Sequence, residues 1–256
     1  MIHPTALVDP QAELAADVSV GAYSLIGAGA RIDSGTVIGP HVVIAGATRI
    51  GKDNQIHAFC SLGGAAQDKK YQGEPTSLEI GARNTIREFC TFNRGTANDV
   101  GSTRVGDDNW IMAYVHVAHD CEVGNNTVFA NNAQLAGHVS VGDYVVLGGF
   151  TGVHQFVHLG AHSFTGIAAV VLQDLPPYVT IAGSPARPYG INSVGIRRRG
   201  FSESAIACIK RAYKTLYRSG FSLAEARERI EQDLPACPEL KIFCDFLASS
   251  SRGIIR

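Results

Sequence analysis

An apolar residue recurs at every sixth position along most of the first 160 residues of the chain. The series consists of Ile2, Val8, Leu14, Val20, Ile26, Ile32, Ile38, Ile44, Ile50, Ile56, Leu62, Ile80, Ile86, Phe92, Val105, Ile111, Val117, Val123, Phe129, Leu135, Val141, Leu147, Val153 and Leu159. An interval of six fits neither an amphipathic helix nor a long alternating strand. It fits short strands joined by corners, each strand pointing one aliphatic side chain inward. Because one such unit cannot bury its apolar residue alone, stacked units must share one core. The pattern predicts an all-β solenoid of hexapeptide repeats.

Two polar segments interrupt the repeat, at residues 63–79 and 93–104. Both are rich in turn-forming residues, so we expect them to loop out from the solenoid. Loops on a rigid scaffold are a common location for functional residues.

The apolar period becomes helical from about residue 201. Ile206, Ile209, Tyr213 and Leu216 share one helical face, and Ser222 with Glu225 forms a capping box for a second helix. Pro238 suits the first turn of a third helix, which carries Leu240, Phe243 and Leu247 on one stripe. We therefore expect a β-solenoid over residues 1–190 and a small helical domain over 191–256. The helices would cover the open end of the solenoid.

Composition narrows the class of protein. The 256 residues are 45% hydrophobic and carry a formal net charge of −1, which predicts an ordered core and argues against nucleic-acid binding. The chain shows neither a secretory signal nor an apolar run long enough to span a bilayer. We expect a cytoplasmic protein without membrane insertion. Its six cysteines form no CxxC pair and are expected to be reduced, buried side chains.

The six-residue repeat resembles that of the hexapeptide transferase superfamily. This resemblance implies a left-handed parallel β-helix in which three hexapeptides form one triangular coil, so positions 18 apart stack. The left hand is an exception to the usual crossover preference.

Histidines concentrate on one stripe of such a prism. Six of the nine histidines lie between residues 116 and 162. With a coil of 18 residues, His119, Gly137 and Gln155 share one column, and Asp120, His138 and Phe156 share the next. An imidazole can take the proton of an attacking hydroxyl. A glycine lets a backbone N–H approach the oxyanion that follows.

This column contains no serine or cysteine as an evident covalent nucleophile, so the sequence favours direct acyl transfer by a single displacement. Periodicity alone does not show whether Asp120 touches His119. It also leaves a rival open, because γ-class carbonic anhydrases use the same solenoid and bind zinc through three histidines. A non-catalytic β-helix would favour a flat repetitive polar face over clustered histidines and irregular loops.

Four segments are more specific: 67–76 (QDKKYQGEPT), 116–143 (HVAHDCEVGNNTVFANNAQLAGHVSVGD), 153–162 (VHQFVHLGAH) and 197–202 (RRRGFS). Together they resemble the acyl-[acyl-carrier-protein]–UDP-N-acetylglucosamine O-acyltransferase family, which starts lipid A synthesis, and the resemblance covers essentially the whole chain. It implies transfer of an (R)-3-hydroxyacyl group from acyl carrier protein to the 3-hydroxyl of the glucosamine ring, without a cofactor or metal. It also implies a homotrimer with sites between subunits.

The same resemblance implies roles for individual residues. His119 would be the general base and Gly137 the oxyanion donor. The substrate-binding positions would be Gln67, Asp68, Lys70, His116, His138, His154, Gln155, Asn192 and Arg199. Residues 186–218 hold eight Lys or Arg against one acidic residue, Glu203. This positive charge suits acidic acyl carrier protein, with Arg197 and Arg198 as contacts.

Two departures bear on selectivity. Asn192-Ser193-Val194 stands where the family commonly has Asn-x-Glu, and Gly183-Ser184-Pro185-Ala186 replaces Gly-Asn-x-Ala. They leave open whether the acceptor carries a 3-hydroxyl or a 3-amino group. By the same resemblance, Ile167 would occupy the position that lines the far end of the acyl groove, where some members have glycine. Its branched side chain would then shorten the groove and predicts a medium-length 3-hydroxyacyl donor; the alternative is that Ile167 packs in the core. The related enzyme that adds the second, N-linked chain has an extra N-terminal domain, whereas the repeat here begins at Ile2.

Overall fold

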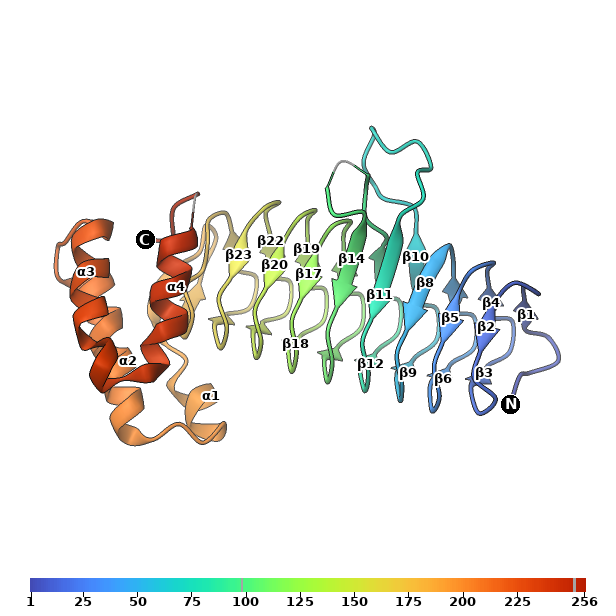
Figure 1. Ribbon diagram of the computed structural model, residues 1–256, viewed down its shortest axis with the longest axis horizontal. Helices are drawn as coiled ribbons and strands as arrows, with labels where there is room; N and C mark the ends of the chain where they lie inside the picture. The colour runs from blue at the N-terminus through green and yellow to red at the C-terminus, as the bar shows by residue number, and fades with distance from the viewer. Residues whose placement is uncertain (98, 251) are drawn as a thin grey trace.

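Short parallel strands form three long sheets that make up the sides of a triangular prism, as the computed structural model of residues 1–97, 99–250 and 252–256 shows (Figure 1). Sheet A, in spatial order, contains β27 (Arg187–Ile191), β26 (Val179–Ala182), β24 (Phe164–Thr165), β21 (Val146–Leu147), β18 (Val128–Phe129), β15 (Trp110–Ile111), β12 (Thr85–Ile86), β9 (Gln55–Ile56), β6 (Val37–Ile38) and β3 (Ser19–Val20). Sheet B contains β1 (Leu7–Val8), β4 (Leu25–Ile26), β7 (Val43–Ile44), β10 (Ser61–Gly64), β13 (Thr91–Asn93), β16 (His116–Val117), β19 (Gln134–Leu135), β22 (Gly152–Val153) and β25 (Val170–Val171). Sheet C contains β2 (Glu13–Leu14), β5 (Arg31–Ile32), β8 (Ala47–Ile50), β11 (Ser77–Ile80), β14 (Ser102–Val105), β17 (Glu122–Val123), β20 (Ser140–Val141) and β23 (His158–Leu159).

The predicted six-residue repeat forms the core of this prism. From Val20 to Leu159, all apolar residues of the series are buried. Strand register stacks residues 18 apart, as in the column that joins His116, Gln134 and Gly152. Each coil contributes one inward side chain per face, so the core is continuous along the prism.

Non-glycine residues with left-handed backbone recur at the prism corners. Asp120 has φ 57° and His138 has φ 62° at corresponding corners of successive coils. Asp, Asn and His adopt this conformation more readily than most residues. Aromatic residues such as Phe59, Phe89 and Phe156 adopt the same conformation at other corners, so the corners carry both polar and aromatic side chains.

The chain leaves the solenoid twice at the corner that joins sheet B to sheet C, which we call the B–C edge. One loop, residues 65–76, connects β10 to β11, and the other, residues 94–101, connects β13 to β14. Asn98 in the second loop lies outside the described residues. Both loops project from the same side of the prism (Figure 1). Strand β11 begins at Ser77, within the segment that the sequence assigned to the first loop.

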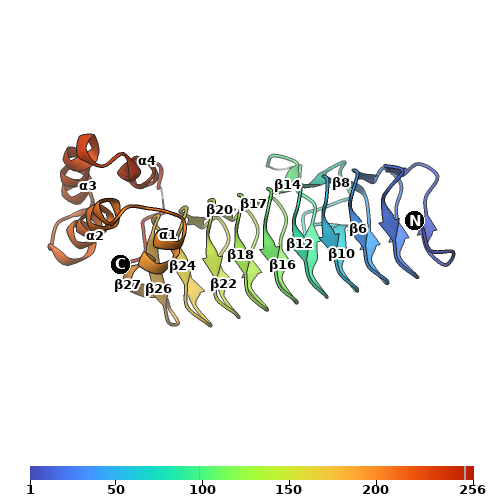
Figure 2. The ribbon, with the colours of Figure 1, turned by 90° about the horizontal axis from the view of Figure 1, so that it is seen from below.

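Helices occupy the C-terminal end of the prism (Figure 2). They are α1 (Ser193–Arg198), α2 (Glu203–Arg218), α3 (Leu223–Asp233) and α4 (Lys241–Ser249), with short 3₁₀ segments η1 (Leu234–Ala236) and η2 (Pro238–Leu240). The predicted capping box is present, because Ser222 N–H donates to Glu225 Oε2 at 2.8 Å and Glu225 N–H donates back to Ser222 Oγ at 3.3 Å. The apolar pattern does not predict α1, because its six residues are too few for a helical period to appear.

One prediction about the cysteines is wrong. Cys208 in α2 and Cys237 before η2 form a disulfide, with their Cα atoms 6.6 Å apart. The two residues are 29 positions apart, so no short sequence motif indicates that they pair. Cys60, Cys90, Cys121 and Cys244 are free and buried, as expected for small apolar side chains. None of the helices in the described part of the chain has the length and apolarity that a bilayer crossing requires.

Candidate active site

His119 and Asp120 form a hydrogen-bonded pair at the B–C edge, between β16 and β17. His119 Nδ1 lies 2.9 Å from Asp120 Oδ2. The Asp120 side chain is fully buried, whereas 12% of the His119 side chain is exposed. A carboxylate that accepts from Nδ1–H fixes the tautomer and leaves the Nε2 lone pair free. The pair therefore has the arrangement of a general base with its orienting acid.

Gly137 lies directly against the His119 ring, one coil further along the edge. A Cβ placed on Gly137 would be 2.6 Å from Cε1 and 2.8 Å from Nε2 of His119. Within the described part of the chain, the Gly137 N–H donates no hydrogen bond. An N–H beside the basic nitrogen is suitably placed to meet an oxyanion.

His138 extends this group of imidazoles along the edge. Its ring meets the His119 ring edge-on at 5.1 Å between centroids and stacks on Phe156 at 4.3 Å. The backbone confirms the predicted columns, since His138 N–H donates to His119 O and Phe156 N–H donates to Gly137 O.

Two further histidines flank this group. His116, on β16, contacts Thr91 Oγ1 through Nδ1 at 2.7 Å, and burial lowers the pKa of its imidazole. His154 is exposed, and its Nδ1 lies 3.1 Å from the Gln155 carbonyl oxygen. That oxygen also accepts from Arg252 in the C-terminal tail, a residue that no repeat or motif in the sequence points to.

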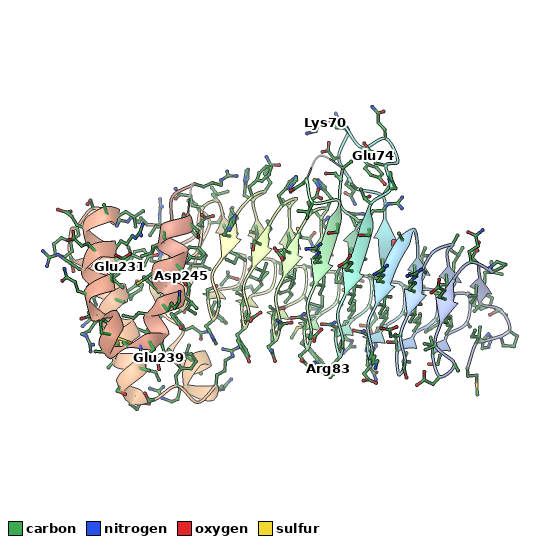
Figure 3. All side chains as sticks on the ribbon, viewed as in Figure 1. Lys70, Glu74, Arg83, Glu231, Glu239 and Asp245 are labelled. Atoms are coloured by element: carbon green, nitrogen blue, oxygen red, sulfur yellow. A yellow bond between two sulfur atoms is a disulfide. The ribbon has the colours of Figure 1, made fainter. Side chains whose placement is uncertain are left out.

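The first loop brings charged groups to the same edge. Lys70 N–H donates to Asp68 Oδ1 at 2.9 Å, and this bond is the main cause that lowers the pKa of the Asp68 carboxyl. The charge of Lys70, whose Nζ lies 3.7 Å from Asp68 Oδ2, acts in the same direction. Asp68 also interacts electrostatically with His119, so the first loop comes near the imidazole at the B–C edge. Gln67 is exposed beside it. Lys70 lies at the outer end of the loop, away from the prism (Figure 3).

Asn192 and Arg199 lie elsewhere, around a hollow of about 650 Å³ on sheet A near the helices. The hollow is lined by Val128, Val146, Phe164, Thr180, Ile191, Asn192, Ser193, Val194, Gly195, Arg198 and Arg199. Asn192 has a structural task, because it caps α1 through Gly195 N–H and donates to the His162 carbonyl oxygen. Arg199 stacks over Tyr144, and burial lowers the pKa of its guanidinium. In the described residues its NH1 atom is buried without a hydrogen-bond partner.

The remaining predicted site residues are exposed. Arg197 pairs with Glu203 at 2.7 Å, and Arg198 borders the hollow on sheet A. Ile167 is 75% exposed at the corner between sheets A and B, so it does not pack in the core. In one chain, the B–C edge, the hollow on sheet A and Ile167 therefore belong to different parts of the prism surface.

The arrangement of polar side chains at the B–C edge fits a hydrogen-bonded group better than it fits a zinc site of three histidines. Among the described residues, the group close enough to share an ion comprises His119, Asp120 and His138, with only two imidazoles. The Asp120 carboxylate already accepts from Thr96 N–H, from Thr96 Oγ1 and from His119. A carboxylate with these donors is stabilised without a metal.

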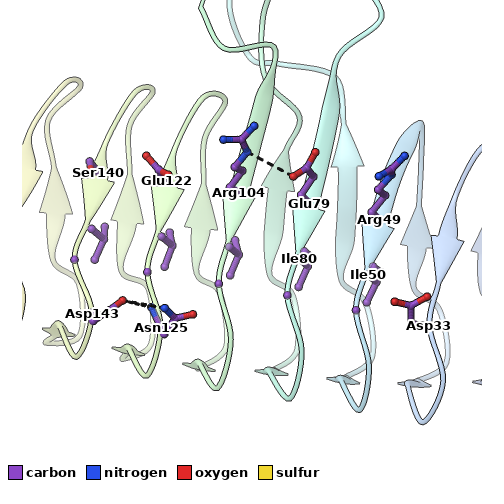
Figure 4. A pocket seen from close by; sticks show the side chains of 18 of the residues that line it. Asp33, Arg49, Ile50, Glu79, Ile80, Arg104, Glu122, Asn125, Ser140 and Asp143 are labelled. Atoms are coloured by element: carbon purple, nitrogen blue, oxygen red, sulfur yellow. Dashed lines mark hydrogen bonds and ion pairs between the residues drawn. The ribbon is translucent and has the colours of Figure 1, made fainter.

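A surface depression of about 870 Å³ lies on the outer face of sheet C (Figure 4). Alternating charges line it, including Arg49 and the ion pair between Glu79 and Arg104 at 3.5 Å. It contains none of the predicted site residues. Cross-strand pairs of opposite charge support a solvated sheet face, and we assign no activity to it.

The parallel β-helix and its histidine-lined edge are typical of hexapeptide-repeat transferases. Residues 102–137 match the model of bacterial transferase hexapeptide repeats, and residues 174–255 match that of the second domain of UDP-N-acetylglucosamine O-acyltransferase. The second match begins in the last coil of the prism, before the expected start of the helical domain at residue 191. These matches and the solved structures below confirm the predicted left-handed parallel β-helix.

Relatives over the full length define the family. The acyl-[acyl-carrier-protein]–UDP-N-acetylglucosamine O-acyltransferase of Thiobacillus denitrificans is 58% identical over 100% of this chain and 99% of its own. LpxA from Acinetobacter baumannii superimposes with a TM-score of 0.98 at 45% identity, over 100% of this chain and 99% of the other. Francisella novicida UDP-N-acetylglucosamine acyltransferase has a TM-score of 0.98 at 39% identity, over 100% and 94% of the two chains. The chain belongs to the acyl-[acyl-carrier-protein]–UDP-N-acetylglucosamine O-acyltransferase family.

Proposed function

We propose that this protein transfers an (R)-3-hydroxyacyl group from acyl carrier protein to the 3-hydroxyl of the glucosamine ring of UDP-N-acetylglucosamine, the first step of lipid A synthesis. The observation that carries the proposal is the buried His119–Asp120 pair with Gly137 packed against its Nε2 side. Full-length family membership supports the two substrates.

The reaction needs no covalent enzyme intermediate. His119 Nε2 accepts the proton of the 3-hydroxyl while the hydroxyl oxygen attacks the thioester carbonyl carbon. The tetrahedral oxyanion accepts a hydrogen bond from Gly137 N–H. When the intermediate collapses, the C–S bond breaks, and the thiolate of the carrier's prosthetic group takes the proton from His119.

The substrates would extend along the surfaces around this pair. Asp68, His116, His138, His154, Gln155, Gln67 and Lys70 would contact the sugar and the acyl donor, because they lie at the B–C edge or in the first loop, which projects from it (Figure 3). Asn192 and Arg199 would hold the nucleotide at the hollow on sheet A, where Arg199 NH1 has no partner among the described residues. Arg197 and Arg198 would contact acidic groups of the carrier protein.

A homotrimer completes such a site. The B–C edge and the hollow on sheet A belong to different parts of one prism, so a substrate that spans both requires a second copy of the chain. We propose that each site combines the B–C edge of one subunit with the hollow and Ile167 of its neighbour. We also propose that the protein works in the cytoplasm.

The test measures acyl transfer to UDP-N-acetylglucosamine from 3-hydroxyacyl-carrier proteins. His119→Ala is expected to lower kcat by about 10²–10⁴-fold, since the general base is lost. His3→Ala, an exposed histidine in the first coil, is the matched control and retains activity. Undiminished transfer by His119→Ala would refute the mechanism. Transfer only to the 3-amino sugar would instead identify an N-acyltransferase, in keeping with Val194 at the hollow where the family commonly has glutamate.

A further inference from the structure

The second loop carries two side chains that bind the catalytic edge directly. Thr96 is 3% exposed and donates twice to the Asp120 carboxylate. Its N–H reaches Oδ1 at 2.8 Å and its hydroxyl reaches Oδ2 at 2.7 Å. Oδ2 is also the atom that accepts from His119 Nδ1. Thr96 therefore orients the Asp120 carboxylate, which in turn orients the His119 imidazole.

Asp99 makes an equivalent contact with the neighbouring imidazole. Its Oδ2 lies 2.6 Å from His138 Nδ1. The other ring nitrogen, Nε2, lies 3.9 Å from Asp120 Oδ2. A carboxylate that accepts from Nδ1–H selects the tautomer in which Nε2 carries no proton. In His138 this nitrogen faces the group formed by His119, Asp120 and His138. His119 and His138 are thus each tied through Nδ1 to a carboxylate.

The two residues are also joined through the backbone. Asp99 N–H donates to the Thr96 carbonyl oxygen at 3.4 Å. The base of the loop is attached to the first loop, because Asn93 Nδ2 donates to Ala65 O at 2.8 Å and Arg94 N–H donates to Gly64 O at 3.0 Å. Gly95 packs against the backbone of Ser102, where a Cβ would lie 2.3 Å from the amide nitrogen.

We propose that Thr96 and Asp99 are positioning residues for the transfer reaction, Thr96 acting through Asp120 on His119 and Asp99 acting on His138. This inference rests on the proposed function for its kinetic consequence, but the orientation of the two rings can be measured without substrate. Neither residue belongs to the six-residue repeat. The second loop would then orient side chains of the active site in addition to bordering the substrate.

The kinetic test compares variants in pairs. Thr96→Val removes the hydroxyl and keeps the shape, so kcat is expected to fall about tenfold with little change in KM, as for loss of a hydrogen bond to a charged group. Thr96→Ser restores the hydroxyl and is expected to restore kcat. Asp99→Ala removes the acceptor and lowers kcat, whereas Asp99→Asn retains an acceptor oxygen and most of the rate. Val100→Ala, 64% exposed in the same loop, is the control that stays unchanged.

A second readout is independent of turnover. Ring ¹⁵N shifts of histidine-labelled protein report which nitrogen of each imidazole is protonated. Thr96→Val is expected to change the His119 signals, and Asp99→Ala the His138 signals, while Val100→Ala changes neither. Unchanged signals and rates in both loop variants would overturn the proposal. Absence of transfer by the unmodified protein, with these signal changes present, would refute the proposed function and support the positioning role.

Discussion

The α-carbon of Gly137 packs so closely on the His119 ring that an added Cβ would lie 2.6 Å from Cε1 and 2.8 Å from Nε2. These contacts are too short for a real side chain, so either the ring or the backbone must shift. The shift would occur at Nε2, the nitrogen proposed to take the proton. Gly137→Ala is therefore expected to lower kcat by about 10²-fold, because it displaces the proposed base relative to the Gly137 N–H.

The control for this substitution is Gly152→Ala on β22, where an added Cβ meets no atom within 4 Å. Steady-state kinetics and the urea midpoint should be measured for both proteins. Retention of full activity by Gly137→Ala would contradict the close fit between glycine and imidazole.

Ile167 is proposed to limit the length of the acyl chain. The residue is 75% exposed at a prism corner, so shortening it should leave the core intact. Ile167→Gly is expected to raise the relative kcat/KM for longer 3-hydroxyacyl donors by about tenfold, since each buried CH₂ contributes about 0.8 kcal/mol. Ile167→Val keeps most of the bulk and serves as the control. A donor panel in steps of two carbons measures the change, and an unaltered preference would exclude Ile167 from the groove.

His162 predicts a dependence of stability on pH. It lies between Tyr144 and Tyr178, and burial, aided by the charge of Arg199, lowers its pKa from 6.5 to about 4. The unfolded chain takes up a proton near pH 6.5, whereas the folded protein does so only near pH 4. Stability from this group is therefore complete above pH 6.5 and is lost as the pH falls toward 4. The loss approaches about 3 kcal/mol, at 1.36 kcal/mol per pKa unit.

Urea unfolding of wild type and His162→Phe at pH 7 and pH 4.5 measures this loss. The aromatic replacement preserves the stack and removes the titration. Between pH 7 and pH 4.5, we expect the free energy of unfolding of wild type to fall by about 2 kcal/mol more than that of His162→Phe. Parallel stability curves would show that His162 does not couple folding to protonation.

Ser222 begins α3 through its reciprocal bonds with Glu225. Ser222→Ala is expected to lower the free energy of unfolding by about 1 kcal/mol, as for other N-caps. Glu225→Gln retains an acceptor for Ser222 N–H and should cost less. The urea midpoints of the two variants give the comparison, and equal losses would argue against a specific cap.

The sequence predicted the features that depend on period. Leu135 and Val153 are buried where the repeat places them, and His119, Gly137 and Gln155 share a column because the coils in this part of the prism are 18 residues long. Thr96 and Asp99 could not be predicted in this way. They approach Asp120 and His138 through a loop whose path depends on its own turns, and no spacing reports that path.

Spacing also fails to predict two other features, the cap of α1 and the disulfide. Helix α1 is only six residues long, so no apolar period identifies Asn192 as its cap. The Cys208–Cys237 pair depends on how α2 packs against η2, a tertiary arrangement that a helical period does not encode.

Strand pairing at Thr85 shows how the prism accommodates its loops. Thr85 pairs with Gln55 thirty positions earlier and with Trp110 twenty-five positions later, whereas His116 pairs with Gln134 at the usual eighteen. The additional residues are extruded at one corner, and the coils on either side keep their alignment. Insertions at that corner therefore change the groups presented to a substrate without changing the hydrogen bonds or the interior of the scaffold. Such a scaffold lets selection alter specificity by lengthening or replacing corner segments, while the folded framework is inherited unchanged.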